Sequence, residues 1–418
     1  MSTYEIVHSS VDDWSAAYTG PKFHAVLCDP PYLMDFMAHR LDWDKSNQNN
    51  PQGWGNAILP HLLPGAVVLM FGGTRTFHRL AVGMEAAGFE MFDTLVWLRG
   101  TGWPKSQDIS KLIDKRDGNK RTEVIGRYKP PDMKSDWNLQ NAVDQRSVEM
   151  FSSSRNNLEV MAPASPESAI WSGWGTALKP AWEPILAFRV PSKQGYADLA
   201  TQFGTGALNI DGCRIDPGTA VSGGGNNFNA WREGEGRDDR PALHQQASGG
   251  HTLGRYPSNV ILDEESAVQL DAQTGVLKSG KAAKGGHKRN PHDHWNCYNP
   301  FNVVSTGTLY GDAGGASRFF YCARASTAER NAGLQAREND HPTIKPISLT
   351  VWLATLCLPS SAVTSRRLLV PFAGVGSEIA GAVLAGWETI VGIEQDARYC
   401  EMAQRRIPTL VSPSNTTA

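Results

Sequence analysis

The residues best suited to chemistry end a short apolar run near the start of the chain, in the segment AVLCDPPYLM at residues 25–34. The run passes directly into Asp29, Pro30, Pro31 and Tyr32. The two prolines fix φ and lack an N–H, so they stiffen the turn and leave nearby carbonyls free to accept hydrogen bonds. The Asp29 carboxylate and the Pro30 carbonyl could then both accept from one amino group. The Tyr32 ring offers a face for stacking a planar base, which is worth about 1–3 kcal/mol.

Such an arrangement would suit methylation of an aromatic amine. The amine is a poor nucleophile because its lone pair is delocalised into the ring. Two acceptors could draw the nitrogen toward tetrahedral geometry and localise that lone pair for in-line attack on a sulfonium methyl. A base in duplex DNA would have to be flipped out to reach the site. The simpler alternative is an aspartate that caps a turn, with prolines that end a strand.

A second candidate site lies in the segment LLVPFAGVGSEIAGAVLAGWETIVGIE at residues 368–394, which predicts a strand, a tight glycine turn, a helix and a second strand. Gly374 and Gly376 allow a sharp turn and a close approach to a ligand. Glu394 ends the second strand, where nucleotide-binding βαβ units use an acid to bind ribose hydroxyls. A dinucleotide fingerprint would need a third glycine where Ile379 stands, so S-adenosylmethionine is favoured. A turn that merely packs tightly is the alternative.

Both motifs are predicted at the carboxyl ends of parallel strands, where ligands bind in open α/β sheets, so they could share one cleft. Together they resemble the amino-methylating DNA methyltransferases, which make N6-methyladenine or N4-methylcytosine. The catalytic tetrapeptide of that family, [DNS]-P-P-[YFW], matches Asp29-Pro30-Pro31-Tyr32, and its cofactor loop, F-x-G-x-G, matches residues 372–376. With the catalytic motif first and the cofactor loop last, the order resembles the β group. GTGWPKS and GTALKPAWEPI look like phage-type members.

The resemblance implies the roles of individual residues. Asp29, Pro30, Pro31 and Tyr32 would be catalytic. The segment HPTIKP at residues 341–346 resembles the family segment that flanks the methionine part of the cofactor. The alternative for Lys345 is a solvated lysine at a helix start. The cofactor-binding residues implied are Asp29, Thr343, Lys345, Phe372, Ala373, Gly374, Gly376, Ser377 and Glu394. One departure is Val370, where many members have an aspartate.

The elements that must position these residues are strands alternating with helices in both end blocks. Buried strands are predicted at 23–28, 66–73 and 93–99, and the segment 368–394 adds two more. This alternation predicts a parallel sheet covered on both faces. Neither end block has enough strands alone, but together they have about six. We therefore predict an α/β fold: one Rossmann-like, S-adenosylmethionine-dependent methyltransferase sheet, built from both ends of the chain.

The middle block is polar and rich in Gly, Asn and Ser, with ordered strands predicted only at 182–191 and 256–263. We predict that residues 1–100 and 341–410 form the catalytic and cofactor-binding domain. Residues 101–340 would be an insert, and the family resemblance places the target-recognition region there. The lysines and arginine at 278–289 predict a phosphate-contacting loop, with a solvated charged loop as the alternative. The Trp-rich segment 171–182 could line the cleft or pack in the core.

The composition of the chain limits the kinds of partner and compartment that can be expected. The formal charge is −2 over 418 residues, so any DNA-binding surface must be local. Six cysteines without a C-x-x-C pair predict a reduced, cytoplasmic setting, and the family resemblance implies a bacterial or phage-encoded protein. No signal peptide and no membrane span are predicted. The histidines and cysteine at 287–297 match no usual zinc spacing, so no metal is expected. The resemblance alone suggests a homodimer acting on double-stranded DNA.

Five functions compete. The lead is site-specific adenine-N6 methylation of DNA, because an aspartate at the first motif position favours adenine, and cytosine-N4 methylation is the runner-up. Methylation of glutamine side chains or RNA is disfavoured by the motif order. A non-catalytic DNA-binding subunit is disfavoured by the intact motifs, and a dehydrogenase by the missing third glycine. The sequence contains no Pro-Cys dipeptide, so the covalent route to C5-methylcytosine is not supported.

Overall fold

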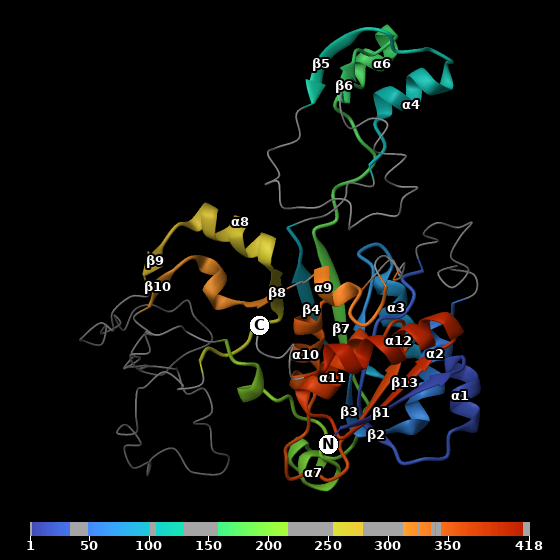
Figure 1. Cartoon of the computed structure of the whole chain (residues 1–418), viewed down its shortest axis with the longest axis vertical. Coiled ribbons are helices and arrows are strands. Elements are labelled where there is room, and N and C mark those ends of the chain that lie inside the picture. Colours follow the sequence, from blue (N-terminus) through green and yellow to red (C-terminus); the bar gives the residue numbers. More distant parts are fainter. Residues whose placement is uncertain are drawn as a thin grey trace, which may run out of the picture.

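The computed structural model describes residues 2–33, 49–100, 106–128, 158–215, 254–278, 312–324, 327–335, 339 and 344–412. A nine-stranded sheet forms its centre (Figure 1). Its strands, in spatial order, are β1 (Thr3–His8), β13 (Thr389–Glu394), β12 (Arg367–Pro371), β2 (Phe23–Cys28), β3 (Leu62–Phe71), β7 (Trp182–Arg189), β4 (Glu90–Leu98), β8 (Val260–Asp263) and β11 (Tyr321–Ala323). Only β7 runs antiparallel to its neighbours in this sheet. The predicted α/β fold is confirmed.

The central strands are buried on both faces because helices cover both sides of the sheet. Every residue of β2 is buried, including His24, as its otherwise apolar sequence predicts. Successive side chains of β2 alternate between two cores, with Leu27 in one and Val26 in the other. The first core includes side chains of α10 (Ile347–Leu356), α11 (Ser377–Ala385) and α12 (Ala397–Leu410). The second includes side chains of α1 (Val11–Ala17), α2 (Pro51–Ile58) and α3 (Phe77–Ala86).

The two ends of the chain contribute six strands to this sheet, as predicted. The range 101–340, expected to form a separate insert, contributes three more: β7, β8 and β11. The expectation that the end blocks alone build the sheet is therefore wrong. The reason is visible in β7, whose residues 184–188 are buried between β3 and β4. A strand whose side chains are so apolar needs a neighbouring strand on each side.

A small group of elements stands apart from the sheet, beyond the end at which β4 finishes (Figure 1). It consists of α4 (Ile109–Arg116), β5 (Val124–Tyr128), β6 (Leu158–Met161) and α6 (Pro166–Ile170), and we call it the α4 unit. Strands β5 and β6 pair antiparallel. Asp114 holds the unit together: its buried carboxylate accepts hydrogen bonds from Arg121 Nε at 2.6 Å and from the Ala164 amide at 3.1 Å.

The other described elements are short or lie at the margins. They are η2 (Leu59–His61), α7 (Tyr196–Phe203), η4 (Asp211–Cys213), α8 (Glu264–Thr274), β9 (Leu277–Lys278), β10 (Ala313–Gly314), η5 (Ala316–Phe319) and α9 (Thr327–Arg330). Within the described ranges, no helix is long and apolar enough to span a membrane.

Candidate active site

The two motifs meet at a topological switch point of the sheet. From β12 the chain passes through α11 to β13 on one side, whereas from β2 it passes to β3 on the other. Strands β12 and β2 are neighbours, with Leu368 opposite Ala25. The crevice at such a reversal is where open α/β sheets bind ligands. Asp29 follows β2 directly and the glycine loop follows β12 directly, so the structure brings the two predicted motifs to adjacent strand ends.

The glycine loop is held in an unusual backbone conformation. Phe372, Gly374 and Gly376 all have positive φ, at 58°, 50° and 82°. A side chain at position 376 would also collide, because a Cβ there would lie 2.7 Å from Cδ1 of Ile407 in α12. Phe372 adopts positive φ without being glycine, and its ring packs edge-on against Trp54 at 4.9 Å. The residues of the loop and their neighbours therefore determine its conformation.

Glu394 connects the loop to the end of β13. Its Oε2 accepts a hydrogen bond from the Gly374 amide at 2.7 Å, and its Oε1 accepts one from the Asp396 amide at 2.8 Å. Burial raises the pKa of Glu394, while these amides oppose the shift. Each carboxylate oxygen has a second lone pair, so Glu394 keeps capacity to accept from ligand hydroxyls. Glu394 thus lies at the end of β13 and contacts the glycine loop, and its role toward a ligand stays a prediction.

Arg406 of α12 supports the same loop, and the sequence patterns did not reveal it. This side chain is fully buried, and its Nη1 donates to the Val375 carbonyl and to Ser377 Oγ, both at 3.0 Å. Its Nε donates to the Glu329 carbonyl at 3.0 Å. Burial lowers the pKa of Arg406 to about 10. The hydroxyl of Ser377, a predicted cofactor residue, therefore contacts Arg406. The one available signal was spacing, since Arg406 lies on the α12 face that carries Ala403 and Ile407.

The predicted catalytic tetrapeptide sits in a buried ionic cluster. Lys345 Nζ lies 2.7 Å from Asp29 Oδ2 and donates to the Tyr32 hydroxyl at 2.9 Å. It also lies 3.4 Å from Oε2 of Glu183, the second residue of β7. The Tyr32 hydroxyl donates to the same Oε2 at 3.2 Å, and Arg99 Nη1 lies 2.5 Å from Oε1. Two cations and two carboxylates thus alternate across the crevice.

One oxygen of this cluster has no hydrogen-bond partner among the described residues. Asp29 Oδ1 is buried and accepts no hydrogen bond from the described residues, whereas Oδ2 is held by Lys345. A buried acceptor without a donor costs free energy, about 1–3 kcal/mol. Such an atom is suited to receive a donor from a ligand that enters the crevice. It is the feature of the site that most directly indicates binding of an amino group.

The charge states of the cluster follow from burial and neighbours. Burial raises the pKa of Asp29, and Lys345 opposes that shift. Burial alone would lower the pKa of Lys345, but the carboxylates of Asp29 and Glu183 raise it above its usual value. Burial disfavours charge on Glu183 too, yet Lys345 and Arg99 bring its pKa below the usual range. Glu378, in the first turn of α11, has its pKa raised to about 7 by burial and by the Asp29 charge.

The cofactor-binding role expected of Lys345 stays a prediction. Its ammonium contacts the predicted catalytic tetrapeptide, and its side chain is only 3% exposed, so the solvated alternative is wrong. Thr343 lies outside the described residues. So do the histidine-rich segment 287–297 and all of the lysine-rich loop beyond Lys278. Within the described part of the chain, no three His, Cys, Asp or Glu side chains gather as a metal site would require.

No family model matches the chain. It is similar to the type II methyltransferase M.HindIII of Haemophilus influenzae, with 24% identity over 177 residues. The aligned part covers 40% of this chain and 42% of that relative, so less than half of the relative's length is matched.

Two solved structures are also similar. They are the M1.HpyAVI–SAM complex (TM-score 0.37, 10% identity, covering 97% of this chain and 100% of that chain) and the PvuII DNA methyltransferase, described as cytosine-N4-specific (TM-score 0.41, 9% identity, covering 97% and 86%). The assignment of the fold rests on the strand order of the chain itself.

The contribution of the buried Lys345–Asp29 pair to stability can be tested. We expect Lys345→Met to lower the free energy of unfolding by about 3–5 kcal/mol, because it leaves the Asp29 carboxylate buried without its cation. Adding Asp29→Asn to the same chain should recover most of that loss. Urea denaturation of the wild type, both single variants and the double variant completes the cycle.

Arg366→Met provides the matched control, because its partner Glu388 is 42% exposed and a surface pair contributes little. If Lys345→Met were as stable as the wild type, the pair would not hold the site together.

Proposed function

We propose that this chain is an S-adenosylmethionine-dependent DNA methyltransferase that methylates the N6 amino group of a flipped-out adenine. The observation that carries the proposal is Oδ1 of Asp29, which is buried and has no hydrogen-bond partner in the part of the chain that the structure describes. It lies at a topological switch point, at the strand end next to a positive-φ glycine loop. The similarity to M.HindIII, whose name describes a type II methyltransferase, supports the same class.

The cofactor site is proposed on the residues around the glycine loop. Phe372, Ala373, Gly374 and Gly376 would form its wall, and the Glu394 carboxylate would accept from the ribose hydroxyls. The absence of a third glycine suits a ligand without a pyrophosphate. When bound, S-adenosylmethionine supplies an electrophilic methyl group on a sulfonium. Ser377 would contribute through its backbone at the start of α11, because its hydroxyl is engaged by Arg406.

The residues of this chain would then activate the amine. Asp29 Oδ1 accepts a hydrogen bond from the amino group and localises the nitrogen lone pair, with the Pro30 carbonyl as the proposed second acceptor. The localised lone pair would then be able to accept the methyl group that bound S-adenosylmethionine would supply, with the electron pair of the broken carbon–sulfur bond left on sulfur. The nitrogen afterwards gives up one proton, for which Asp29 Oδ1 is the neighbouring acceptor. The Tyr32 ring is the proposed stacking face for the base.

The alternative is methylation of the N4 amino group of cytosine. The same carboxylate and cofactor arrangement would serve either base, and only the aspartate at the first motif position favours adenine. Double-stranded DNA is the proposed partner in both cases. The homodimer implied by the family resemblance and the target-recognition role of residues 101–340 remain part of this proposal.

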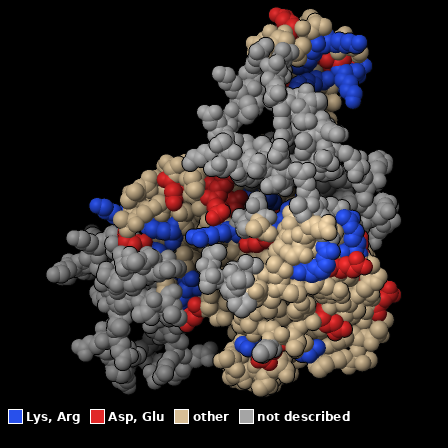
Figure 2. Space-filling model, viewed as in Figure 1, with Lys and Arg blue, Asp and Glu red and all other residues tan. Residues whose placement is uncertain are grey.

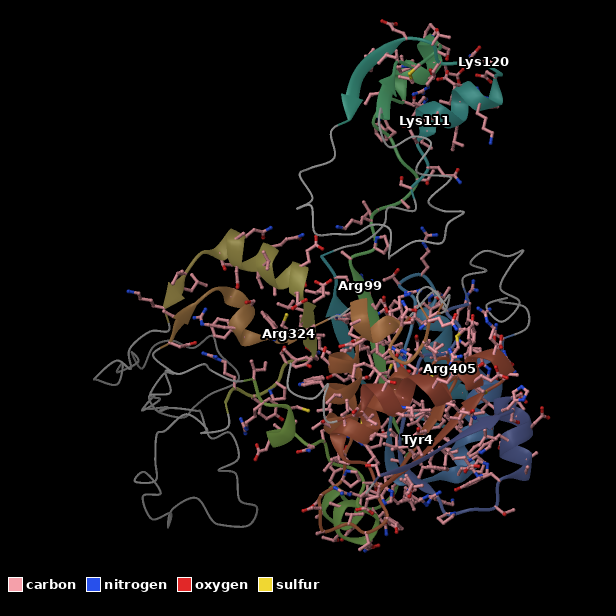
Figure 3. All side chains as sticks on the ribbon, viewed as in Figure 1. Tyr4, Arg99, Lys111, Lys120, Arg324 and Arg405 are labelled. Atoms are coloured by element: carbon pink, nitrogen blue, oxygen red, sulfur yellow. The ribbon has the colours of Figure 1, made fainter. Side chains whose placement is uncertain are left out.

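The α4 unit is the proposed contact for the DNA backbone among the described residues. Lys and Arg side chains gather on the side of the unit that α4 occupies (Figure 2), and Figure 3 shows Lys111 and Lys120 projecting from it. Lys111, Lys115 and Lys120 are exposed. Arg116 differs, because Asp117 and Glu167 already neutralise it. Three exposed lysines on one small unit form a local basic surface, which a chain of net charge −2 needs for phosphate contacts.

The reaction can be tested directly. The protein is incubated with plasmid DNA and labelled S-adenosylmethionine, and the DNA is digested to nucleosides and chromatographed. We expect label in N6-methyladenine. Label in N4-methylcytosine would replace the lead by its alternative, and unlabelled DNA would contradict both.

The roles of the two carboxylates should separate. Asp29→Ala should abolish methyl transfer while calorimetry still detects S-adenosylmethionine binding, because the cofactor loop is untouched. Glu394→Gln should weaken cofactor binding roughly 10- to 100-fold, since hydrogen bonds to a charged group are worth about 1.5–3 kcal/mol. Turnover near the wild-type rate in Asp29→Ala would overturn the proposed mechanism.

The DNA-contacting role of the α4 unit predicts a change in salt dependence. Replacing Lys111, Lys115 and Lys120 by Gln should reduce the slope of log K against log salt by about 0.9 for each phosphate that the variant no longer neutralises. Lys22→Gln with Lys193→Gln is the control, since both side chains are exposed and lie at the opposite end of the strands, before β2 and after the antiparallel β7. Equal slopes for the triple variant and the wild type, measured by fluorescence anisotropy, would remove the α4 unit from the DNA interface.

A further inference from the structure

Two residues that the sequence patterns did not single out lie where the α4 unit joins the sheet. Arg99 follows β4 as the chain leaves for the unit, and Glu183 lies near the start of β7, where the chain returns (Figures 1 and 3). The Arg99 amide donates to the Ala181 carbonyl at 2.9 Å, and Lys179 Nζ donates to the Gly100 carbonyl at 2.7 Å. The two connections are therefore fastened together beside the catalytic cluster.

The two carboxylate oxygens of Glu183 contact different groups at this junction. Its Oε1 pairs with Arg99, whereas its Oε2 accepts from the Tyr32 hydroxyl and lies 3.4 Å from Lys345 Nζ. The Glu183 side chain is 16% exposed and that of Lys345 only 3%, so water screens their interaction weakly. Lys345 and Tyr32 stand between the Glu183 carboxylate and Asp29. The influence of Glu183 on the orientation of Asp29 therefore passes through the two groups that it holds.

We propose that Glu183 is a positioning residue that anchors Lys345 and Tyr32, so that Oδ2 of Asp29 is occupied and Oδ1 alone is left to receive the substrate amine. This inference rests on the function proposed above. Tyr32 has one hydroxyl hydrogen, and Glu183 takes it. Without a carboxylate at position 183, that hydrogen becomes available to the nearby Asp29, and Lys345 loses one of its two fixed anions. Either change would compete with the amine for Oδ1.

A purely structural link between β4 and β7 is the competing explanation, and pH dependence separates the two. The charged and titratable groups around the cluster are Asp29, Tyr32, Arg99, Glu183, Lys345, Glu378 and Cys28. Glu183 contributes to raising the pKa of both Asp29 and Lys345. Methyl transfer needs Asp29 ionised, which sets the acidic limit, and Lys345 protonated, which sets the alkaline limit. Removing the Glu183 charge should therefore move both limits to lower pH.

Arg99 should have the opposite effect. It partly neutralises Glu183, so Arg99→Gln leaves that carboxylate acting more strongly on Asp29 and Lys345. Both limits should then move to higher pH. Arg99 is 42% exposed, so its replacement is tolerated even if replacement of Glu183 is not. Opposite shifts of the active pH range in Glu183→Gln and Arg99→Gln would not arise from a simple loss of packing.

The experiment compares methyl-transfer rates across pH for the full-length wild type, Glu183→Gln, Glu183→Asp and Arg99→Gln, at saturating DNA and S-adenosylmethionine. We expect Glu183→Gln to lower kcat about tenfold or more with KM for DNA little changed, because a small misplacement of a reacting group is costly. Its active pH range should shift downward, Glu183→Asp should restore the range, and Arg99→Gln should shift it upward.

Glu388→Gln is the matched control, a carboxylate paired with Arg366 away from the crevice, and should leave rate and range unchanged. An unshifted pH range in Glu183→Gln, even with a lower rate, would overturn the positioning role. If Glu183→Gln does not fold, an unshifted or downward range in Arg99→Gln overturns it instead. A wild type that transfers no methyl group to DNA would refute the proposed function itself, which is a distinguishable outcome.

Discussion

The contact between Lys345 Nζ and Asp29 Oδ2 is the constraint on which the rest of the site depends. It joins residues 316 positions apart in the chain, and both side chains are almost fully buried. Placing one of these charges in that environment alone would cost several kcal/mol, so each requires the other. The pair therefore fixes the start of α10 against the end of β2. It also fixes the orientation of the Asp29 carboxylate, with one oxygen held and the other open.

The cofactor side of the crevice depends on backbone geometry rather than on charge. Positive φ at Phe372, Gly374 and Gly376 creates a turn that most sequences cannot adopt, and Glu394 ties its amide to β13. Arg406 holds the carbonyl side of the same turn from α12. A backbone fixed from two sides is already arranged to contact a ligand closely, which lowers the ordering cost of binding.

The sequence was most informative where local pattern determines structure. The buried run before Asp29 and the strand–glycine–helix pattern before Glu394 each specify a strand end, and the sheet brings parallel strand ends together. Glu183 could not be found this way. It stands at the amino end of its strand, and reaches the crevice only because β7 runs antiparallel, a direction that its sequence does not encode. Arg406 was missed because an arginine on a polar helix resembles a solvated residue until the packing of α12 is known.

The expected boundary between a catalytic sheet and an insert failed for a related reason. Strand β11 has three residues, too few for a periodic signal, whereas the strands at β7 and β8 were predicted but assigned to the insert, because a strand pattern does not say which sheet the strand joins. The participation of β7 in the sheet also bears on the catalytic cluster. Because β4 ends and β7 begins at the catalytic cluster, the two strands connected to the α4 unit meet that cluster at Arg99 and Glu183. From Glu183, contacts with Lys345 and Tyr32 lead directly to Asp29, so the strand that returns from the α4 unit is linked to the catalytic carboxylate through two side chains.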